Sequence, residues 1–346
     1  MASTAPAFTM PAEWAPHERT WMAFPSANPT FDDPQGLDAA RRAWAAVADT
    51  IARYEPVTLI TAVGESALAR EYLTSPQITL AERPLDDAWM RDIGPTFVTS
   101  ARTGRLAAVD WVFNGWGAQS WATWEHDRHI AGEVAALAGA ERIPSTLVNE
   151  GGGIHVDGEG TVLLTETVQL DQGRNPGLGK AEVEAEIHAR LGTRKALWLP
   201  RGLTRDYDEY GTRGHVDIVA SFLRHGVVAV HRQLDPAHPD FEPTREIAAL
   251  LRASTDAHGC PLEVVEIPAP RTLTDPDGAP VDYSYINHYL CNGAVVLCAF
   301  DDPHDERAAE VFARAFPHRK VELVDAREIF ANGGGIHCIT QQQPAV

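Results

Sequence analysis

The sequence predicts a mixed α/β protein in which about five strand–helix units form a closed ring. Helical periodicity appears in about five places, and short β-rich runs separate these places. The predicted helices start roughly 55 to 90 residues apart, which indicates a repeated unit. The segment GGGIH also occurs twice, at 151–155 and 333–337. Because no polar linker separates the units, one domain over residues 1–346 is favoured, and a mixed α/β sheet with a chance repeat is the alternative.

The predicted helices follow apolar residues that recur at spacings of three and four positions. Proline suits the first helical turn, so Glu242-Pro243 and Asp302-Pro303 are candidate starts for the last two helices. The apolar faces are Trp44, Val47, Ala48 and Ile51 within 38–54; Ile130, Val134 and Leu137 within 125–139; Val183, Ile187 and Leu191; Ile247, Leu250 and Leu251; and Ala308, Val311, Phe312 and Ala315.

Short runs rich in β-branched and other apolar residues predict the strands. From residue 215 the order reads strand, strand, helix, strand, and the same order recurs from residue 285. The runs are PVTLITAV (56–63), TVLLTET (161–167), KALWLP (195–200), HVDIVASF (215–222), GVVAVH (226–231), LEVVEIP (262–268), YINHYL (285–290), AVVLCAF (294–300) and KVELVD (320–325).

The composition is that of an ordinary globular protein, with 44% hydrophobic and 22% charged residues in 346. A formal net charge of −19 argues against a nucleic-acid partner, because phosphate binding needs basic clusters. No apolar run approaches the roughly 18 residues that a membrane span requires. The first residues show no signal peptide, and four scattered cysteines make no disulfide framework, so a cytoplasmic location is expected.

Cys338 is a candidate nucleophile because it follows the second glycine run, where the first repeat has Val156. Glycine lets the backbone approach a ligand closely, so Gly334 and Gly335 are candidate substrate contacts. A free cysteine is more often a small buried hydrophobic residue than a nucleophile. The assignment therefore depends on which polar residues accompany the thiol.

His215 and Asp217 stand two positions apart at the head of a run that predicts a strand. On a strand, side chains at i and i+2 point to the same face, so a base and a carboxylate would lie side by side. Such a pair suits proton transfer or metal binding. A polar pair hydrogen-bonded at the end of a strand is an equally good interpretation.

Three further residues are candidates because of their neighbours. Asp92 precedes a Gly-Pro turn, and Trp89 lies three residues before it, although such residues usually form a turn and a core contact. Glu150 directly precedes the first glycine run, either as a surface residue or as a partner that orients a histidine. His155 and His337 occupy matching positions of the repeat, which favours symmetric structural roles over catalysis for both.

Sequence signatures of other enzyme classes are missing. The chain contains no HEXXH, no paired CxxC, no P-loop, no strand-linked GxGxxG and no GxSxG. His215 and Asp217 could bind a metal, but no third ligand stands at a diagnostic spacing.

The candidate residues and the segments around them resemble the agmatine deiminase family. Its members are bacterial relatives of the peptidylarginine deiminases within the guanidine-modifying superfamily. The likeness covers nearly the whole chain, and it implies the pentein fold, a five-bladed α/β propeller with the active site at its central axis. The segments that carry it are MPAEWAPHERTWMAFP, WMRDIGPTFV, VDWVFNGWG, EGGGIHVDGEGTVLLTE, RNPGLGK, WLPRGL, GHVD and GGGIHCITQQQPA.

The resemblance also implies a role for each candidate residue. Cys338 is expected to be the nucleophile and His215 the general acid and base. Asp92 and Asp217 are expected to hold the guanidinium group, and Glu150 is expected to orient His215. No metal and no organic cofactor is implied.

The resemblance also implies an aromatic contact with the substrate, because Trp89 matches a tryptophan that lies close to the substrate in the family. Two carboxylates can each accept paired N–H donors from a planar guanidinium, and a soft thiolate can then attack its central carbon. Ammonia would leave from an S-amidino intermediate, which water would hydrolyse to a ureido product.

One departure from the family pattern concerns the choice of substrate. Members of the family carry an acidic or amide residue two positions before the histidine, where this chain has Arg213. Arg213 could repel a terminal ammonium, bind a substrate carboxylate, point into solvent, or pair with Asp206, Asp208 or Glu209.

Agmatine is the expected substrate, with N-carbamoylputrescine and ammonia as products. The expected partner is thus a small cationic guanidine, with no nucleic acid, no membrane and, as the default oligomer, a homodimer. The alternatives are a deiminase of a guanidino acid or arginine derivative, an amidinotransferase, a metallohydrolase using His215 and Asp217, and a non-catalytic guanidine-binding protein.

Overall fold

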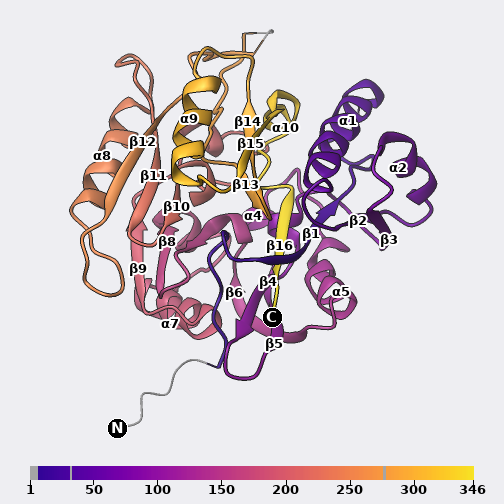
Figure 1. Ribbon diagram of the computed structural model, residues 1–346, viewed down its shortest axis with the longest axis horizontal. Helices are drawn as coiled ribbons and strands as arrows, with labels where there is room; N and C mark the ends of the chain where they lie inside the picture. The colour runs from indigo at the N-terminus through magenta and orange to yellow at the C-terminus, as the bar shows by residue number, and fades with distance from the viewer. Residues whose placement is uncertain (1–6, 32, 276–277) are drawn as a thin grey trace.

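A computed structural model describes residues 7–31, 33–275 and 278–346 of the chain (Figure 1). The strands of this part of the chain form five separate small sheets, with helices between them. None of the sheets formed by these residues closes on itself. The predicted mixed α/β class is confirmed, whereas the ring of five blades stays a prediction.

Four of the sheets repeat one plan. Each has three strands in chain order, of which the first two are antiparallel and the last two are parallel. The strands are β4 (Thr96–Ser100), β5 (Arg105–Val112) and β6 (Glu141–Val148); β7 (Ile154–Val156), β8 (Thr161–Thr165) and β9 (Lys195–Leu199); β10 (Ala220–Arg224), β11 (Val227–Arg232) and β12 (Glu263–Pro268); and β13 (Tyr289–Cys291), β14 (Ala294–Ala299) and β15 (Lys320–Asp325).

The remaining sheet joins the two ends of the described chain. Strand β16 (Thr340–Pro344) is antiparallel to β1 (His17–Ala23), which is parallel to β2 (Val57–Thr61), and β2 is parallel to β3 (Ile78–Glu82). Figure 1 shows the yellow β16 beside the indigo β1. This pairing brings the segment around Cys338 next to the first described residues of the chain.

The five predicted helices are confirmed, and each is the crossover that a parallel pair of strands requires. Most residues of the apolar stripes read from the sequence are buried, among them Trp44, Val47 and Ile51 of the first helix. The exceptions are Leu137, which is 42% exposed, and Leu250, Val311 and Ala315, which are partly buried. The crossover helices are α1 (Pro34–Ile51), α5 (Ile130–Leu137), α7 (Lys180–Leu191), α8 (Phe241–Arg252) and α9 (Asp305–Ala315).

Helix boundaries differ from the predicted ranges by several residues. Helix α1 starts at Pro34 because the Asp33 carboxylate accepts the backbone N–H of Gly36 at 2.7 Å and caps the helix. Pro243 lies in the first turn of α8, as predicted, but Pro303 stands two residues before the start of α9. The short helices α2 (Ser66–Tyr72), α3 (Met90–Ile93), α4 (Gly115–Ala118), α6 (Glu166–Gln169) and α10 (Arg327–Ala331) complete the α-helices of the described residues, which also contain the 3₁₀ helices Asp127–His129, Gly151–Gly153, Thr204–Tyr207 and Val216–Ile218.

Two strand predictions are wrong at the functionally important ends. Residues 215–222 were expected to be extended from His215, but β10 starts only at Ala220 and Val216–Ile218 form a 3₁₀ turn. His215 and Asp217 therefore do not share a strand face. Residues 285–288 are also not a strand, since β13 starts at Tyr289.

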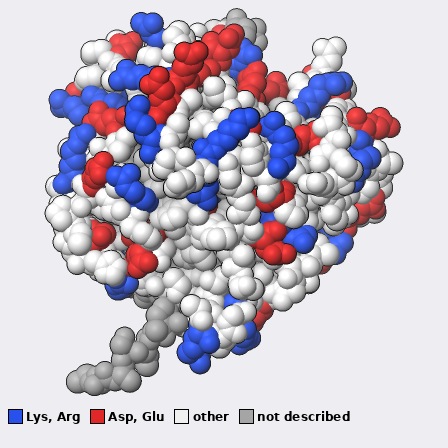
Figure 2. All heavy atoms as spheres, in the orientation of Figure 1, with Lys and Arg blue, Asp and Glu red and all other residues white. Residues whose placement is uncertain are grey.

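Charged side chains of both signs are mixed on the face shown in Figure 2. Salt bridges such as Arg252–Glu266 at 2.7 Å and Arg224–Glu263 at 3.1 Å pair them over the neighbouring elements α8 and β10–β12. Within the described residues, none of the helices has both the length and the apolar character needed to cross a bilayer.

Candidate active site

The structure brings the five predicted catalytic residues together from distant parts of the chain. Asp92 lies in α3, Glu150 directly precedes the 3₁₀ turn Gly151–Gly153, and His215 directly precedes the turn that contains Asp217. Cys338 lies between α10 and β16. All five are at most 5% exposed, so the cluster forms a polar site inside the molecule.

The His215 imidazole lies between two carboxylates. Its Nε2 atom is 3.3 Å from Oε2 of Glu150, and its Nδ1 atom is 3.8 Å from Oδ2 of Asp92. Burial alone would lower the pKa of His215, but the charges of Asp92, Glu150 and Asp217 raise that pKa to about 9. The imidazole is therefore protonated at neutral pH and can donate a proton.

Glu150 is held as an anion by a buried arginine that the sequence reading did not identify. Arg174 donates from Nε to both carboxylate oxygens of Glu150 at 3.0 Å, and from Nη2 to the backbone oxygen of Thr212 at 2.8 Å. Burial favours the neutral acid, but Arg174 and His215 lower the pKa of Glu150 to about 2. Glu150 is thus a fixed, charged partner for His215.

Asp92 is positioned by two donors from other segments. Trp116 donates its indole N–H to Oδ2 at 2.9 Å, and the backbone N–H of Gly152 donates to Oδ1 at 3.0 Å. Burial raises the pKa of Asp92 to about 6, since the nearby His215 charge offsets only part of the cost of burial. A bound cation would favour the ionised form.

Asp217 bridges the thiol and a histidine. Its Oδ2 atom is 2.7 Å from Nδ1 of His337 and 3.5 Å from Sγ of Cys338. Burial would raise the pKa of Asp217, but His337, His215 and Arg91 lower it below the usual value. Asp217 is therefore an anion beside the sulfur.

The Cys338 thiol is neutral in this environment. Burial raises its pKa well above the usual value, and the negative charges of Asp217 and Asp92 raise it further. Asn287 limits the shift, because its amide Nδ2 atom donates to Sγ at 3.2 Å. A positive charge placed among these groups would stabilise the thiolate.

Within the part of the chain that the structure describes, two buried polar atoms of the site have no hydrogen-bond partner, namely Nδ1 of His215 and Oδ1 of Asp217. Buried polar groups without partners are uncommon and call for an explanation, such as a ligand that they bind. One is the donor of a protonated imidazole and the other is an acceptor on a carboxylate. Together with Asp92 they suit a small ligand that carries N–H donors and positive charge.

Asn287 is a site residue that the sequence reading missed. It lies in a segment that was predicted as a strand, but its Oδ1 atom accepts the backbone N–H of His337 at 2.9 Å while its Nδ2 atom contacts the thiol. Its Nδ2 atom also lies 3.3 Å from the backbone oxygen of Asp217. No motif in the sequence points to it, because its contacts depend on tertiary structure.

Asp206 folds the loop that presents His215. Its buried carboxylate accepts the backbone N–H groups of Thr212, Gly214 and His215 at 2.6–3.1 Å, and the Thr212 hydroxyl at 2.7 Å. These hydrogen bonds to one carboxylate explain why the chain turns here and does not form the predicted strand.

The glycines of the second repeat leave room beside the thiol. A Cβ atom on Gly334 would lie 2.8 Å from Cζ3 of Trp89 and 3.1 Å from Sγ of Cys338. A Cβ atom on Gly335 would lie 2.4 Å from Oδ1 of Asn287. This glycine therefore leaves room for the Asn287 side-chain amide. Trp89 and Gly334 thus lie close to the sulfur, and their predicted contacts with the substrate stay a prediction.

Gly334→Ala is expected to lower kcat/KM by at least about tenfold, because the added methyl group displaces Trp89 or the thiol from its position. Steady-state ammonia release would measure the change. Gly36→Ala is the matched control, since its added Cβ would meet Asp33 only at an ordinary 3.5 Å. Equal activities of the two variants would contradict this placement of Gly334.

Arg213 pairs with a residue that was not among its expected partners. Its Nη1 atom is 3.1 Å from Oδ2 of Asp171, which also receives Nη1 of Arg174 at 2.9 Å. The side chain of Arg213 is 39% exposed. With Asp206 it makes a backbone hydrogen bond, Asp208 pairs with Arg205 instead, and within the described residues Arg213 forms no ion pair with Asp208 or Glu209.

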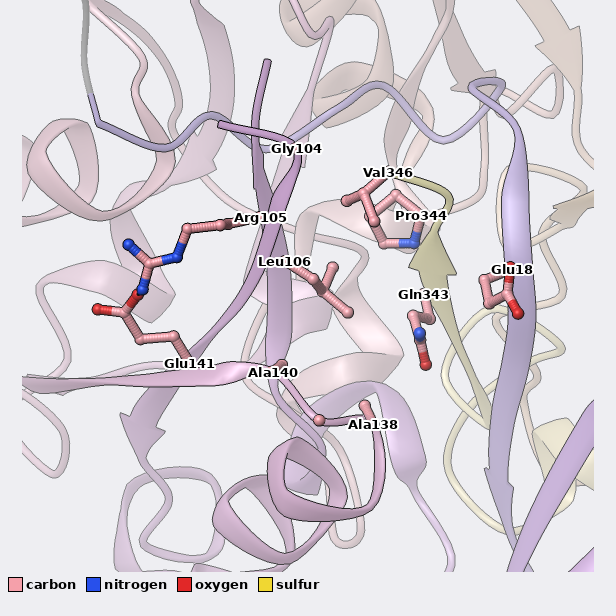
Figure 3. A pocket seen from close by; sticks show the side chains of 11 residues that line it. Glu18, Gly104, Arg105, Leu106, Ala138, Ala140, Glu141, Gln343, Pro344 and Val346 are labelled. Carbon is pink, nitrogen blue, oxygen red and sulfur yellow. The ribbon is translucent and has the colours of Figure 1, made fainter. Parts of the chain in front are cut away.

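A large surface hollow of about 690 Å³ lies elsewhere in the molecule (Figure 3). Leu106, Ala138, Gln343 and Val346 are among its lining residues, and none of the predicted site residues borders it. A smaller hollow of about 40 Å³ has Tyr210 and Gly333 among its lining residues, and none of the predicted site residues lines it either. Among the described residues, no group of histidine, cysteine and acidic side chains is arranged to hold a metal ion.

Known proteins are similar to this chain over nearly its whole length. The model of the Porphyromonas-type peptidyl-arginine deiminase family matches residues 9–344. A relative from Streptomyces coelicolor is 66% identical over 97% of this chain and 99% of its own length. The agmatine deiminase of Pseudomonas fluorescens is 39% identical over 99% of this chain and 96% of its own length.

A solved structure of the agmatine deiminase of Enterococcus faecalis superposes with a TM-score of 0.91 and 32% identity, covering 100% of this chain and 99% of that one. The family match and these relatives all extend over nearly the whole length of the chain. The chain therefore belongs to the Porphyromonas-type peptidyl-arginine deiminase family and is similar, within it, to the agmatine deiminases.

Proposed function

We propose that this chain is an agmatine deiminase, which hydrolyses the guanidinium group of agmatine to N-carbamoylputrescine and ammonia. The observation that carries the proposal is the convergence of a thiol, an imidazole and two carboxylates around two unpartnered buried atoms, on Asp217 and His215. Relatives over the whole chain length are named agmatine deiminases, which supports the choice of substrate.

In this proposal, Asp92 and Asp217 hold the planar guanidinium through charge-assisted hydrogen bonds, each contributing roughly 1.5–3 kcal/mol. The free Oδ1 atom of Asp217 accepts from one edge of the fork. Trp89, which is 4% exposed and lies beside Gly334, packs against the bound group. The carbon of the guanidinium is then within reach of Cys338, and binding supplies orientation for attack.

The bound cation would activate the nucleophile. Because burial, and then the charges of Asp217 and Asp92, disfavour a thiolate in the empty site, Cys338 releases its proton to water only when positive charge lies beside it. The thiolate then attacks the central carbon and forms a tetrahedral adduct. This order of events keeps the buried thiol unreactive until substrate is present.

His215 would transfer protons in both halves of the reaction. As an imidazolium, oriented by Glu150, it protonates the departing nitrogen, the C–N bond breaks, and ammonia leaves an S-amidino intermediate. The neutral imidazole then takes a proton from water, whose oxygen attacks the same carbon. The C–S bond breaks, the ureido product leaves, and the sulfur regains a proton.

The contacts of Arg213 favour agmatine over a guanidino acid. Asp171 lies 3.1 Å from the Arg213 guanidinium and compensates its charge, so the side chain is engaged and not free to bind a carboxylate.

Agmatine is expected to show a higher kcat/KM than arginine or an ω-guanidino acid, measured by steady-state ammonia release. Arg213→Gln should leave that order of preference unchanged, because Asp171 already neutralises Arg213. A preference for a carboxylate-bearing guanidine that disappears in Arg213→Gln would overturn the choice of agmatine.

Other reactions at the same site predict different products. An amidinotransferase would pass the amidino group to an added amine and would release less ammonia than guanidine consumed. A metallohydrolase using His215 and Asp217 would lose activity with a chelator. A protein that only binds guanidines would behave the same after Cys338→Ser. Ammonia release in stoichiometric amounts, insensitive to chelators, would exclude all three.

The finer features of the fold belong to the same proposal. We propose that the five sheets are blades of one propeller in a single domain over residues 1–346, with the active site at the axis. The repeated strand plan, and the arrival of site residues from loops before or after several different sheets, support this arrangement. The proposed setting is a cytoplasmic enzyme, as a homodimer, that acts on a small molecule and not on nucleic acid.

A further inference from the structure

The two GGGIH segments meet at one carboxylate. Glu13, which is 3% exposed, lies with Oε1 2.8 Å from Nε2 of His337 and with Oε2 3.6 Å from Nε2 of His155. The two imidazole rings are 6.2 Å apart and inclined by 30°. The matching histidines of the repeat therefore share Glu13, a residue close to the start of the described chain.

Only one of the two histidines is connected to the active site. The second ring nitrogen of His337 is 2.7 Å from Oδ2 of Asp217, which is itself 3.5 Å from the Cys338 sulfur. The second ring nitrogen of His155 instead accepts the backbone N–H of Phe222 at 3.3 Å. Thus His155 of the first repeat contacts a backbone N–H group, whereas His337 of the second repeat contacts a carboxylate of the site.

We propose that Glu13 is a positioning residue that acts through His337 to keep Asp217 ionised and its free oxygen directed at the guanidinium. The inference rests on the proposed function, because it assumes that Asp217 holds the substrate. Neither Glu13 nor His337 touches the reacting atoms, so both act through Asp217. The chain Glu13–His337–Asp217 fixes the Oδ2 side of the carboxylate and leaves Oδ1 without a protein partner.

The charges behind the site support this role. Arg91 is 3.6 Å from Glu13 and donates to the backbone oxygen of His337 at 3.2 Å, so two cations balance the two anions Glu13 and Asp217 when His337 is protonated. Burial and Arg91 would lower the pKa of His337, but Glu13 and Asp217 raise it. The groups that face His337 and Asp217 are Glu13, Arg91, His155 and His288 behind the site, and His215, Asp92 and Cys338 within it.

Loss of the Glu13 charge has a consequence of definite sign. Without this anion His337 tends to be neutral, and Asp217 loses the positive partner that keeps its pKa low. The pKa of Asp217 then rises, and a protonated Asp217 accepts poorly from a guanidinium. The acid side of the kcat/KM profile should consequently move to higher pH, mainly through KM.

The test uses matched substitutions of the two repeat histidines in the full chain. His337→Asn keeps a donor near Asp217 but cannot reach Glu13, and His155→Asn keeps an acceptor for Phe222 but likewise loses Glu13. We expect Glu13→Gln and His337→Asn to lower kcat/KM for agmatine at neutral pH by about tenfold, with the acid side of the profile shifted upwards. His155→Asn should stay close to the parent. The proposal would be overturned if kcat/KM fell equally in all three variants and in proportion to the fall in melting temperature. It would also be overturned if kcat/KM did not fall in Glu13→Gln.

A second measurement separates this inference from the proposed function. Long-range ¹H–¹⁵N NMR reports the protonation of ring nitrogens without any turnover, and His337→Asn identifies the His337 signals. We expect His337 to carry protons on both nitrogens at neutral pH in the parent and on one in Glu13→Gln. An unchanged His337 spectrum in Glu13→Gln would contradict the role of Glu13, whereas a parent that releases no ammonia from any guanidine would contradict only the proposed function.

Discussion

Cys338→Ser is expected to abolish ammonia release from agmatine while agmatine still binds. A serine hydroxyl is a far weaker nucleophile than a thiolate, and a bound cation cannot ionise it at neutral pH. We expect kcat to fall by at least about a thousandfold, as for other nucleophiles removed from a catalytic group. The guanidinium contacts of Asp92 and Asp217 remain, so calorimetry should still detect binding.

The control for this substitution is Cys260→Ser, because Cys260 is an exposed free thiol outside the site. It should leave kcat and KM unchanged. Appreciable ammonia release by Cys338→Ser, or an equal loss in Cys260→Ser, would show that Cys338 is not the nucleophile.

Asp217→Asn should produce the next largest loss. The substitution removes a buried negative charge that pairs with His337, that lies 3.5 Å from the thiol and that we propose to face the guanidinium. Loss of a charge-assisted hydrogen bond of roughly 1.5–3 kcal/mol corresponds to about 10- to 100-fold in kcat/KM. We expect a higher KM together with a lower kcat, because the carbon is no longer held opposite the sulfur.

Thermal melting and a control at a buried carboxylate that is not a site residue separate this effect from misfolding. Asp305, the first residue of α9, is also buried and accepts the hydroxyl of Tyr285 at 2.7 Å. Asp305→Asn should lower the melting temperature without raising KM. If Asp217→Asn and Asp305→Asn raised KM equally, the proposal that Asp217 contacts the guanidinium would be wrong.

The crossover helices could be predicted from the sequence because one physical signal dominates each of them. Trp44, Val47 and Ile51 recur at the helical period, and the structure buries all three completely. Strand β16 gave no such signal. Its glutamines are buried as hydrogen-bonding partners, for example Gln343, which accepts the indole N–H of Trp21 at 3.0 Å. A buried polar strand looks like a surface loop until its neighbours are known.

The site residues divide in the same way. Cys338, His215 and Asp92 stand in recognisable segments, so the resemblance identified them, and the structure places them together. Arg174 and Asn287, in contrast, act through contacts with residues far away in the sequence. Local patterns cannot reveal such partners, because the need for them arises only when the charges of the site are buried.

The central claim, a covalent amidino intermediate on Cys338, is tested most directly by intact mass after brief exposure to agmatine and an acid quench. The parent should gain the mass of agmatine less one ammonia during turnover, because the adduct keeps the aminobutyl chain, and peptide mapping should place it on residue 338. Cys338→Ser should show no added mass under the same conditions. Ammonia release at full rate without such an adduct, or the same adduct in Cys338→Ser, would contradict the mechanism.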